Sequence, residues 1–289
     1  MNEKLVFIIN PISGIRSKDM LESNIQSICE RNQKDYEIFY TQYAKHLPLL
    51  VEELVKKGYK KIIVAGGDGT INEAGSVLIH QDVALGIIPQ GSGNGLARHL
   101  KISLDPKKAI EQIVESNKTI TIDVGKVNEY YFFSNAGLGF DADVIKHYET
   151  IPDRGLKTYF RASFKSLAHF KRFEISLNNE KKKFKTFLVN VANGSQYGYG
   201  YTVAPVASLQ DGVLDLVAGT MKSKFGLLCF GAELLFKIKK TTKLGLRKAI
   251  KDITIHASEK VPLQTDGELK GNVDQAHFEV VPNSLKIII

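Results

Sequence analysis

Hydrophobic positions in the first 120 residues follow two alternating patterns. Strand-like apolar runs lie at 4–10, 36–41, 62–66 and 83–89. Stretches with helical spacing separate them, at 17–31, 45–57 and 70–79. Parallel strands that are buried on both faces read as continuous apolar runs, and helices connect them. The pattern therefore predicts a three-layer α/β domain with a mainly parallel sheet.

Beyond residue 119 the strand-like segments become short and closely spaced. Examples are TITIDVGKV (119–127), KTFLVNVAN (185–193) and GVLDLVAG (212–219). Helical patterns interrupt them near 154–170 and 223–240. This rhythm is typical of a mostly β sandwich or barrel. We therefore expect an α/β domain over residues 1–123 and a β-sandwich domain over residues 124–289.

The composition places the chain among globular proteins, with 43% hydrophobic and 24% charged residues in a length of 289. No apolar run reaches the roughly 18–20 residues that a membrane-spanning helix needs. The start, MNEKLVFIINPISG, reads as a first strand and not as a signal peptide. Two cysteines cannot build a disulfide framework, and seven scattered histidines give no zinc-site spacing. We expect a cytoplasmic protein.

Charge is distributed unequally between the two parts. Residues 1–123 carry 15 basic and 15 acidic side chains, whereas residues 124–289 carry 24 and 16, so the second part holds the whole net charge of +8. Such asymmetry indicates an anionic partner for the second part. No nucleic-acid-binding signature and no Trp occur. This leaves an anionic membrane surface or a phosphorylated substrate.

The strongest chemical motif is the turn GGDG (66–69), which directly follows a buried strand. Glycines let the backbone approach a ligand, and a helix N-terminus attracts phosphate. Thr70 is a plausible N-cap, with Glu73 completing a capping box. The Asp68 carboxylate would repel a phosphate, so its presence in this turn indicates that it contacts a cation or a substrate hydroxyl. An ordinary strand-to-helix turn is the alternative interpretation.

Two more glycine-bearing turns follow predicted strands, NPISG (10–14) and GSGNG (91–95). The carboxyl ends of parallel strands share one edge of the sheet, where ligands bind in open α/β folds. Neither turn is a P-loop or a GxGxxG fingerprint, which disfavours a dehydrogenase.

In the second part, TDGE (265–268) and DGVLD (211–215) read as turns between strands when each is taken alone. NAGLGFD (135–141) and the Asn193–Gly194 region read as polar, glycine-rich breaks between apolar segments.

Taken together and in this order, NPISG, GGDGTINE, PQGSGNGLAR, NAGLGFDADV, YGYGYTVAP–DGVLDL and TDGE resemble the diacylglycerol kinase catalytic-domain family, which includes bacterial diacylglycerol kinases, sphingosine kinases and ceramide kinases. The resemblance covers roughly residues 4–270. It implies an ATP-binding α/β domain of the NAD-kinase and diacylglycerol-kinase type, a lipid-binding β sandwich, and an active site in the cleft between them. It also implies an ATP- and Mg²⁺-dependent lipid kinase, with diacylglycerol converted to phosphatidic acid.

The resemblance also implies roles for individual residues. Glu268 would accept the proton of the lipid hydroxyl, with Asp68 as its partner or competitor. The nucleotide would contact Asn10, Thr41, Gly66, Gly67, Asp68, Gly69, Thr70, Asn72 and Ser92. A structural Mg²⁺ would use Asp211, with carbonyl groups near Ser208 and Val213.

The sequence departs from many bacterial members at Ser92, where they have Thr, and at Gly95, where they have Asp. This leans towards the sphingosine and ceramide kinase pattern. A sphingoid or ceramide kinase is therefore an alternative. An NAD-kinase-like enzyme is another, if the second domain binds a nucleotide and not a lipid. A catalytically silent nucleotide- or membrane-binding regulator is the alternative of another class.

Basic residues Arg154, Lys157, Arg161 and Lys165 fall on one helical stripe, with aromatic and aliphatic bulk elsewhere on the helix. A second acid-free basic run covers 234–251. Basic residues beside apolar surface favour docking on anionic lipid, and a solvated helix face is the alternative. We expect an anion- or membrane-binding patch that includes Arg16, Lys18, Arg161 and Lys165, and peripheral association with the inner face of the membrane. The oligomeric state stays open, a homodimer included.

Overall fold

The structure is a computed structural model of the chain. It describes residues 4–11, 18–116, 118–153, 155–169, 171–178, 180–198, 201–202, 204–220 and 245–289. The chain divides into two compact units: unit 1 comprises Met1–Asp123 and Pro282–Ile289, and unit 2 comprises Val124–Val281. Several expected features lie outside the described residues: Arg16, Arg154, residues 12–14 of the NPISG turn, the helical segment 223–240 and the basic run as far as residue 244.

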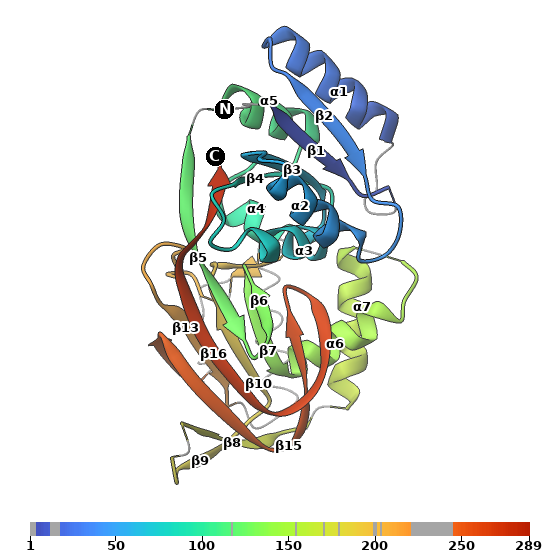
Figure 1. Cartoon of the computed structure of the whole chain (residues 1–289). Helices are drawn as coiled ribbons and strands as arrows, with labels where there is room; N and C mark the ends of the chain where they lie inside the picture. The colour runs from blue at the N-terminus through green and yellow to red at the C-terminus, as the bar shows by residue number, and fades with distance from the viewer. Residues whose placement is uncertain are drawn as a thin grey trace. The chain divides into compact units, whose positions relative to one another are not determined.

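Unit 1 alternates strands with helices, as the hydrophobic pattern predicted (Figure 1). In chain order its elements are β1 Leu5–Ile9, α1 Lys18–Arg31, β2 Tyr36–Tyr40, α2 His46–Lys56, β3 Lys61–Gly66, α3 Asp68–Leu78, β4 Ala84–Pro89, α4 Gly95–His99 and α5 Pro106–Glu115. The strand order is β2-β1-β3-β4, and neighbouring strands are parallel.

Helices cover both faces of this sheet. The buried side chains of α1 and α5 form one cluster with alternate residues of β1 and β3, such as Phe7 and Ile63. The intervening residues of β3, Ile62 and Val64, are also fully buried, and α2 packs on α3 beside β3. Continuous apolar runs arise because each strand is covered from both sides. The predicted three-layer α/β architecture is confirmed.

Unit 2 is mostly antiparallel β structure (Figure 1). Its described elements are the later part of β5 Thr119–Val127, β6 Tyr130–Phe132, β7 Asn135–Gly139, α6 Phe140–Glu149, α7 Leu156–Ala168, β8 Phe173–Leu177, β9 Lys183–Thr186, β10 Leu188–Ala192, β11 Gln196–Gly198, β12 Tyr201–Thr202, β13 Leu214–Gly219, β14 Gly245–Ile250, β15 Asp252–Thr265 and most of β16 Glu268–Ile288. The main strand order is β14-β13-β10-β7-β15-β16. One apolar cluster, which includes Phe132, Leu138, Val189 and Phe278, forms its core. The predicted β-sandwich class is confirmed.

The last eight residues return to unit 1, although the division of the sequence at residue 123 groups them with the second part. Lys286 and Ile287 pair in parallel with β4. The Ser284 carbonyl accepts the His80 N–H at 2.7 Å, and the Asn283 N–H donates to Asp123 Oδ1 at 2.8 Å. The segment LKII (285–288) is a mostly apolar run like the other strands of the sheet. Only its pairing with β4 shows that it belongs to unit 1 and not to the second part of the chain.

Two local expectations were wrong. Helix α3 begins at Asp68 with Gly67 as N-cap and no capping side chain, so Thr70 and Glu73 form no capping box. The Thr70 side chain packs on Gly66 instead: a Cβ added to Gly66 would lie 2.4 Å from the Thr70 Cβ. The segment NAGLGFD (135–141), expected to be a polar break, forms the buried strand β7 and the first two residues of helix α6.

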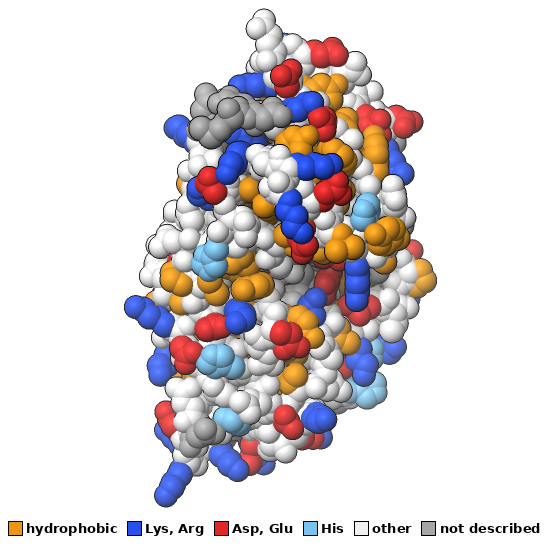
Figure 2. Space-filling view, in the orientation of Figure 1, with side chains coloured by type: hydrophobic (Ala, Val, Ile, Leu, Met, Phe, Trp, Pro, Cys, Tyr) orange, Lys and Arg blue, Asp and Glu red, His pale blue; other side chains and the backbone are white. Residues whose placement is uncertain are grey.

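No helix among the described residues combines the length and the apolar character needed to span a bilayer. The face drawn in Figure 2 carries basic and acidic side chains interspersed, so the positive charge forms no single continuous patch on it.

Candidate functional site

The carboxyl ends of the parallel strands bring several predicted nucleotide contacts to one edge of unit 1. Ile9 of β1 is in register with Tyr40 of β2 and Ala65 of β3. The residues that follow these strands, among them Asn10 and Thr41, therefore leave the sheet at the same edge. The Thr41 N–H donates to the Ile9 carbonyl at 3.2 Å, and Thr41 is buried.

The two glycine turns of unit 1 are packed against each other. A Cβ added to Gly91 would lie 2.6 Å from the Gly67 Cα, and one added to Gly67 would lie 3.2 Å from the Gly91 Cα. Side chains at these positions would therefore push the turns apart. The Gln90 N–H also donates to the Gly66 carbonyl at 2.9 Å, which continues the pairing of β3 with β4.

Asp68 connects these turns through its carboxylate. Asp68 Oδ2 accepts the Asn94 N–H at 2.7 Å, and Oδ1 accepts the Gly95 N–H at 2.8 Å. These are the first N–H groups of α4, which have no partner inside the helix. From the sequence alone, we expected a cation or a hydroxyl beside a carboxylate in this turn. The structure supplies backbone N–H groups.

Asn94 completes the second glycine turn in a left-handed conformation with φ 53°. Its Oδ1 accepts the Gly91 N–H at 3.0 Å, and its Nδ2 donates to the Gly91 carbonyl at 2.6 Å. Arg98 Nε donates to the Gly93 carbonyl at 2.8 Å. Asn tolerates this conformation better than most residues because its short side chain bonds locally. Neither Asn94 nor Arg98 was predicted as a site residue from the sequence.

The remaining predicted residues of unit 1 are near this edge or at the start of the first helix. Gly69, Thr70 and Asn72 lie in the first turns of α3, and Ser92 lies in the second glycine turn. All four are partly buried. Lys18 is exposed at the first residue of α1.

In unit 2, TDGE forms the tight hairpin between β15 and β16. Thr265 pairs with Glu268, and the two turn residues have positive φ, 47° at Asp266 and 84° at Gly267. Asp-Gly is favoured in two-residue hairpin turns that need positive φ at both positions. The predicted turn is therefore present, and Glu268 is the first residue after it.

The Asp266 carboxylate holds a second segment, the one before β7. Its oxygens accept the N–H groups of Phe133 at 2.8 Å, Ser134 at 2.8 Å and Asn135 at 3.2 Å. The Asp266 N–H donates to the Asn135 carbonyl at 2.9 Å. Four hydrogen bonds therefore fix the hairpin end against the start of β7.

Glu268 is partly exposed and pairs with a lysine. Lys270 Nζ lies 2.9 Å from Glu268 Oε2, and the exposed fractions of the two side chains are 19% and 45%. The Lys270 ammonium also lies 5.5 Å from the centre of the Tyr130 ring, within the range of a cation–π contact. Lys270 was missed because one lysine in a strand carries no sequence signal.

A buried polar cluster lies behind the hairpin, in the NAGLGFD region. Gly137 of β7 is in register with Asn190 of β10 and Gln264 of β15. Gln264 Nε2 donates to Asn135 Oδ1 at 2.9 Å and to Asp141 Oδ2 at 3.3 Å. A Cβ added to Gly137 would lie 1.9 Å from Asp141 Oδ2, so glycine makes room for this carboxylate.

The expected magnesium turn contains two carboxylates. Asp211 Oδ1 accepts the Val213 N–H at 3.2 Å, and Ser208 Oγ accepts the Gln210 N–H at 3.2 Å. Burial and the nearby Asp211 charge raise the pKa of Asp215 above its ordinary value. A bound divalent cation would offset this repulsion, so the oxygen donors of the turn suit Mg²⁺.

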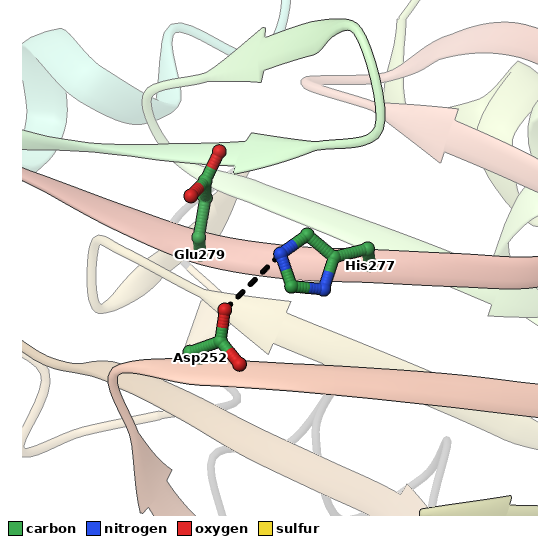
Figure 3. A group of neighbouring side chains, drawn as sticks. All are labelled: Asp252, His277 and Glu279. Carbon is green, nitrogen blue, oxygen red and sulfur yellow. Dashed lines mark ion pairs between the residues drawn. The ribbon is translucent and has the colours of Figure 1, made fainter. Parts of the chain in front are cut away.

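The described residues also contain a group that the sequence analysis missed, Asp252, His277 and Glu279 (Figure 3). Their ligand atoms lie within 4.8 Å of one another. His277 Nε2 is 3.1 Å from Asp252 Oδ2, and Glu279 Oε1 is 2.8 Å from Lys126 Nζ. The pairing of β15 with β16 creates the group, which local spacing cannot reveal. The Lys126 ammonium already pairs with Glu279, so a metal cation would have to displace it.

Helix α7 exposes a mixed basic and aromatic face. Lys157, Arg161 and Lys165 are exposed, and so is Phe164, with 64% of its surface accessible. Thr158, Ala162 and Ser166 are buried. The expectation that the apolar bulk lies away from the cations is wrong for Phe164, because small residues fill the buried side of the helix.

Two family models cover the chain. The diacylglycerol kinase catalytic domain matches residues 4–127, and the YegS C-terminal NAD kinase beta sandwich-like domain matches residues 134–289. Solved structures share the fold: a diacylglycerol kinase from Bacillus anthracis str. Sterne aligns with a TM-score of 0.79 at 22% identity, covering 99% of this chain and 96% of that one. An NAD kinase from Archaeoglobus fulgidus in complex with ATP aligns with a TM-score of 0.53 at 13% identity, covering 99% and 93%. The fold is thus that of the diacylglycerol kinases and NAD kinases.

Curated relatives carry the comparison further. YtlR of Bacillus subtilis (strain 168), provisionally named a lipid kinase, is 30% identical over 92% of this chain and 93% of its own length. A diacylglycerol kinase from Staphylococcus carnosus (strain TM300) is 27% identical over 99% and 97%. The chain belongs to the lipid kinase family that combines a diacylglycerol kinase catalytic domain with a YegS-type C-terminal domain.

Proposed function

We propose that the protein transfers the γ-phosphoryl group of ATP to the hydroxyl of diacylglycerol and so produces phosphatidic acid. The observation that carries the proposal is the pair of packed glycine turns at the carboxyl edge of the unit 1 sheet, in a chain of the lipid kinase family. Several relatives are named diacylglycerol kinases, which supports this acceptor.

In unit 1, the nucleotide contacts Gly66, Gly67, Gly69 and Ser92 through the two glycine turns. Asn10, Thr41, Thr70 and Asn72 add polar groups from the neighbouring strand ends and from α3. Phosphoryl transfer depends mainly on positioning and on neutralising charge. Closely packed turns without Cβ atoms bring backbone N–H groups near the phosphates.

In unit 2, Glu268 accepts the proton of the lipid hydroxyl. The hydroxyl oxygen forms a bond to the γ-phosphorus, the bond from that phosphorus to the bridging oxygen breaks, and ADP leaves. Asp266 fixes the hairpin that carries Glu268, and Lys270 orients its carboxylate. A positioned base contributes about 10²–10⁴-fold to such a reaction.

Mg²⁺ is the metal that the oxygen donors suit. Asp211 would bind it in the turn before β13, with carbonyl groups near Ser208 and Val213 and with Asp215 nearby. A Mg²⁺ ion bound with ATP would neutralise charge on the transferred phosphate.

We also propose that the protein works at an anionic membrane surface, inside the cell. The exposed cations of α7 would attract anionic headgroups, and Phe164 between them would enter the interface. Each Lys or Arg near such a surface contributes about 1 kcal/mol. In unit 1, Lys18 is exposed at the start of α1 and would attract the same headgroups.

A sphingoid or ceramide acceptor is the second candidate, favoured by Ser92 and Gly95 in the second glycine turn. The test is transfer from γ-labelled ATP, with Mg²⁺, to diacylglycerol, monoacylglycerol, sphingosine, ceramide and NAD in anionic mixed micelles. Label on diacylglycerol that disappears with Glu268→Gln supports the proposal. Label on a sphingoid lipid or on NAD alone replaces the acceptor, and nucleotide binding without transfer to any acceptor favours a silent regulator.

A further inference from the structure

The carboxylate of Asp68 bridges two glycine turns that the chain separates by more than twenty residues. Its two oxygens accept the N–H groups of Asn94 and Gly95 at 2.7 and 2.8 Å. Both donors belong to the backbone, so their positions follow the path of the second turn and not a side-chain rotamer. A hydrogen bond to an ionised acceptor is about twice as strong as one between neutral groups.

Close packing around this contact leaves little freedom. A Cβ added to Gly93 would lie 2.7 Å from Asp68 Oδ2, and one added to Gly91 would lie 2.6 Å from the Gly67 Cα. The backbone of the second turn therefore approaches both the Asp68 carboxylate and the first turn. Any movement of the carboxylate moves Gly91–Gly95, including Ser92.

We infer that Asp68 is a positioning residue that locks the second glycine turn onto the first and thereby shapes the nucleotide site, leaving proton transfer to Glu268. The inference rests on the proposed function, because that proposal supplies the nucleotide. The lock, meaning the two hydrogen bonds from Asp68 to the second turn, is a property of unit 1 with or without a ligand. Protonating either oxygen would weaken a hydrogen bond that holds the turn. A residue that must stay ionised to keep the site in shape is poorly suited to accept the proton of the substrate.

Asp68→Asn tests the lock directly. An amide has one acceptor oxygen, and its NH₂ group would face the other backbone N–H, so one of the two hydrogen bonds is lost. Asp68→Ala removes both. We expect hydrogen exchange at the Asn94 and Gly95 amides to accelerate at least about tenfold in Asp68→Ala, with the exchange of core amides in β3 unchanged. Unchanged exchange at Asn94 and Gly95 would overturn the lock.

Gly93→Ala disturbs the same contact from the other side and keeps the carboxylate. We expect it to weaken binding of a fluorescent ATP analogue about tenfold or more, as Asp68→Ala does. Asp274→Asn, which changes an exposed carboxylate of unit 2, is the control and should bind like the wild type. If Gly93→Ala bound the analogue normally, the positioning role would be refuted.

The kinetic constants kcat and KM distinguish a positioning role of Asp68 from a role in the transfer step. We expect Asp68→Asn to raise the KM for ATP more than it lowers kcat, whereas Glu268→Gln lowers kcat with the KM for ATP unchanged. Asp68→Asn with normal nucleotide affinity and a lost kcat would overturn the inference, because the carboxylate would then act in the transfer step. A wild-type protein that transfers phosphate to no acceptor would refute the proposed function, and amide exchange would still decide the lock.

Discussion

Asp68 of unit 1 and Asp266 of unit 2 each precede a glycine, and each carboxylate accepts backbone N–H groups from a distant segment. Asp68 lies in the first turn of an α-helix at the edge of a parallel sheet and holds two amides. Asp266 lies in a two-residue hairpin with φ 47° and holds three.

The difference between the two turns lies in what the carboxylate holds in place. At Asp68 the held segment is itself a glycine turn that carries a proposed nucleotide contact, Ser92. At Asp266 the held segment anchors the hairpin, and the proposed proton acceptor is Glu268, two residues further on. An aspartate in a glycine turn can therefore be structural, and the proposed functional group lies two residues away or on the turn that the aspartate holds.

The largest expected effect is the loss of phosphate transfer in the Glu268→Gln variant. We expect kcat to fall by about 10²–10⁴-fold, because the amide cannot accept the hydroxyl proton. The partly exposed side chain should leave the urea midpoint of unfolding unchanged. Labelled phosphate transfer to diacylglycerol checks it. Near-normal turnover would show that Asp68 or another group is the base, and the contrast between the two turns would fail.

The next largest effect is expected on stability, from Asp266→Asn. Asn tolerates the positive φ, so the substitution changes mainly the hydrogen bonds. All three amides lose an ionised acceptor, and the new NH₂ group faces at least one of them, so we expect the free energy of unfolding to fall by about 3 kcal/mol. Urea unfolding followed by circular dichroism measures it. Asp68→Asn, with two amides, should cost less; an equal or larger cost would contradict the comparison.

Gly137→Ala probes the polar cluster that supports the hairpin of unit 2. The new Cβ would lie 1.9 Å from Asp141 Oδ2, and Asp141 is hydrogen-bonded to Gln264, two residues before Asp266. We expect a loss of about 1–3 kcal/mol from overpacking. Thermal unfolding gives the shift in midpoint. No destabilisation would show that the carboxylate moves away freely and that the cluster does not support the turn.

The smallest effect is expected at Asp82, a carboxylate held by ammonium groups and not by amides. Hydrogen bonds to Lys286 and Lys60 lower its pKa to about 2. Because this pKa lies below the unfolded value of about 3.9, its contribution to stability is present above pH 4 and is lost as the pH falls towards 2.

Asp82→Asn should therefore lower the thermal midpoint slightly at pH 6 and leave it unchanged near pH 2. Melting curves of both proteins across this range test it, with Asp274→Asn as an exposed control. A difference that is the same at all pH values would show that charge is not the cause.

Much of the fold follows from the sequence. Runs such as IIVA of β3 are buried on both faces, and their period and length predict strands directly. The common edge of Asn10, Thr41 and the two glycine turns also follows, because parallel strands end together. The hairpin at Asp266–Gly267 was predicted from its dipeptide.

What could not be predicted depends on distant partners. The Asp68 amides lie 26 and 27 residues away, and those of Asp266 more than 130. Asp252 and Glu279 meet through strand pairing alone. In each case the sequence shows a carboxylate, and only the tertiary structure shows which groups surround it.

The return of Pro282–Ile289 to unit 1 has a consequence for biosynthesis. Unit 2 is one continuous stretch, so it can complete its folding as soon as that stretch has left the ribosome. Unit 1 begins first, yet the strand that pairs with β4 emerges only after all of unit 2 has been made. During synthesis the parallel sheet of unit 1 therefore keeps the edge of β4 uncovered until residues 282–289 emerge. Truncation or tagging near residue 289 then affects the unit whose synthesis began first.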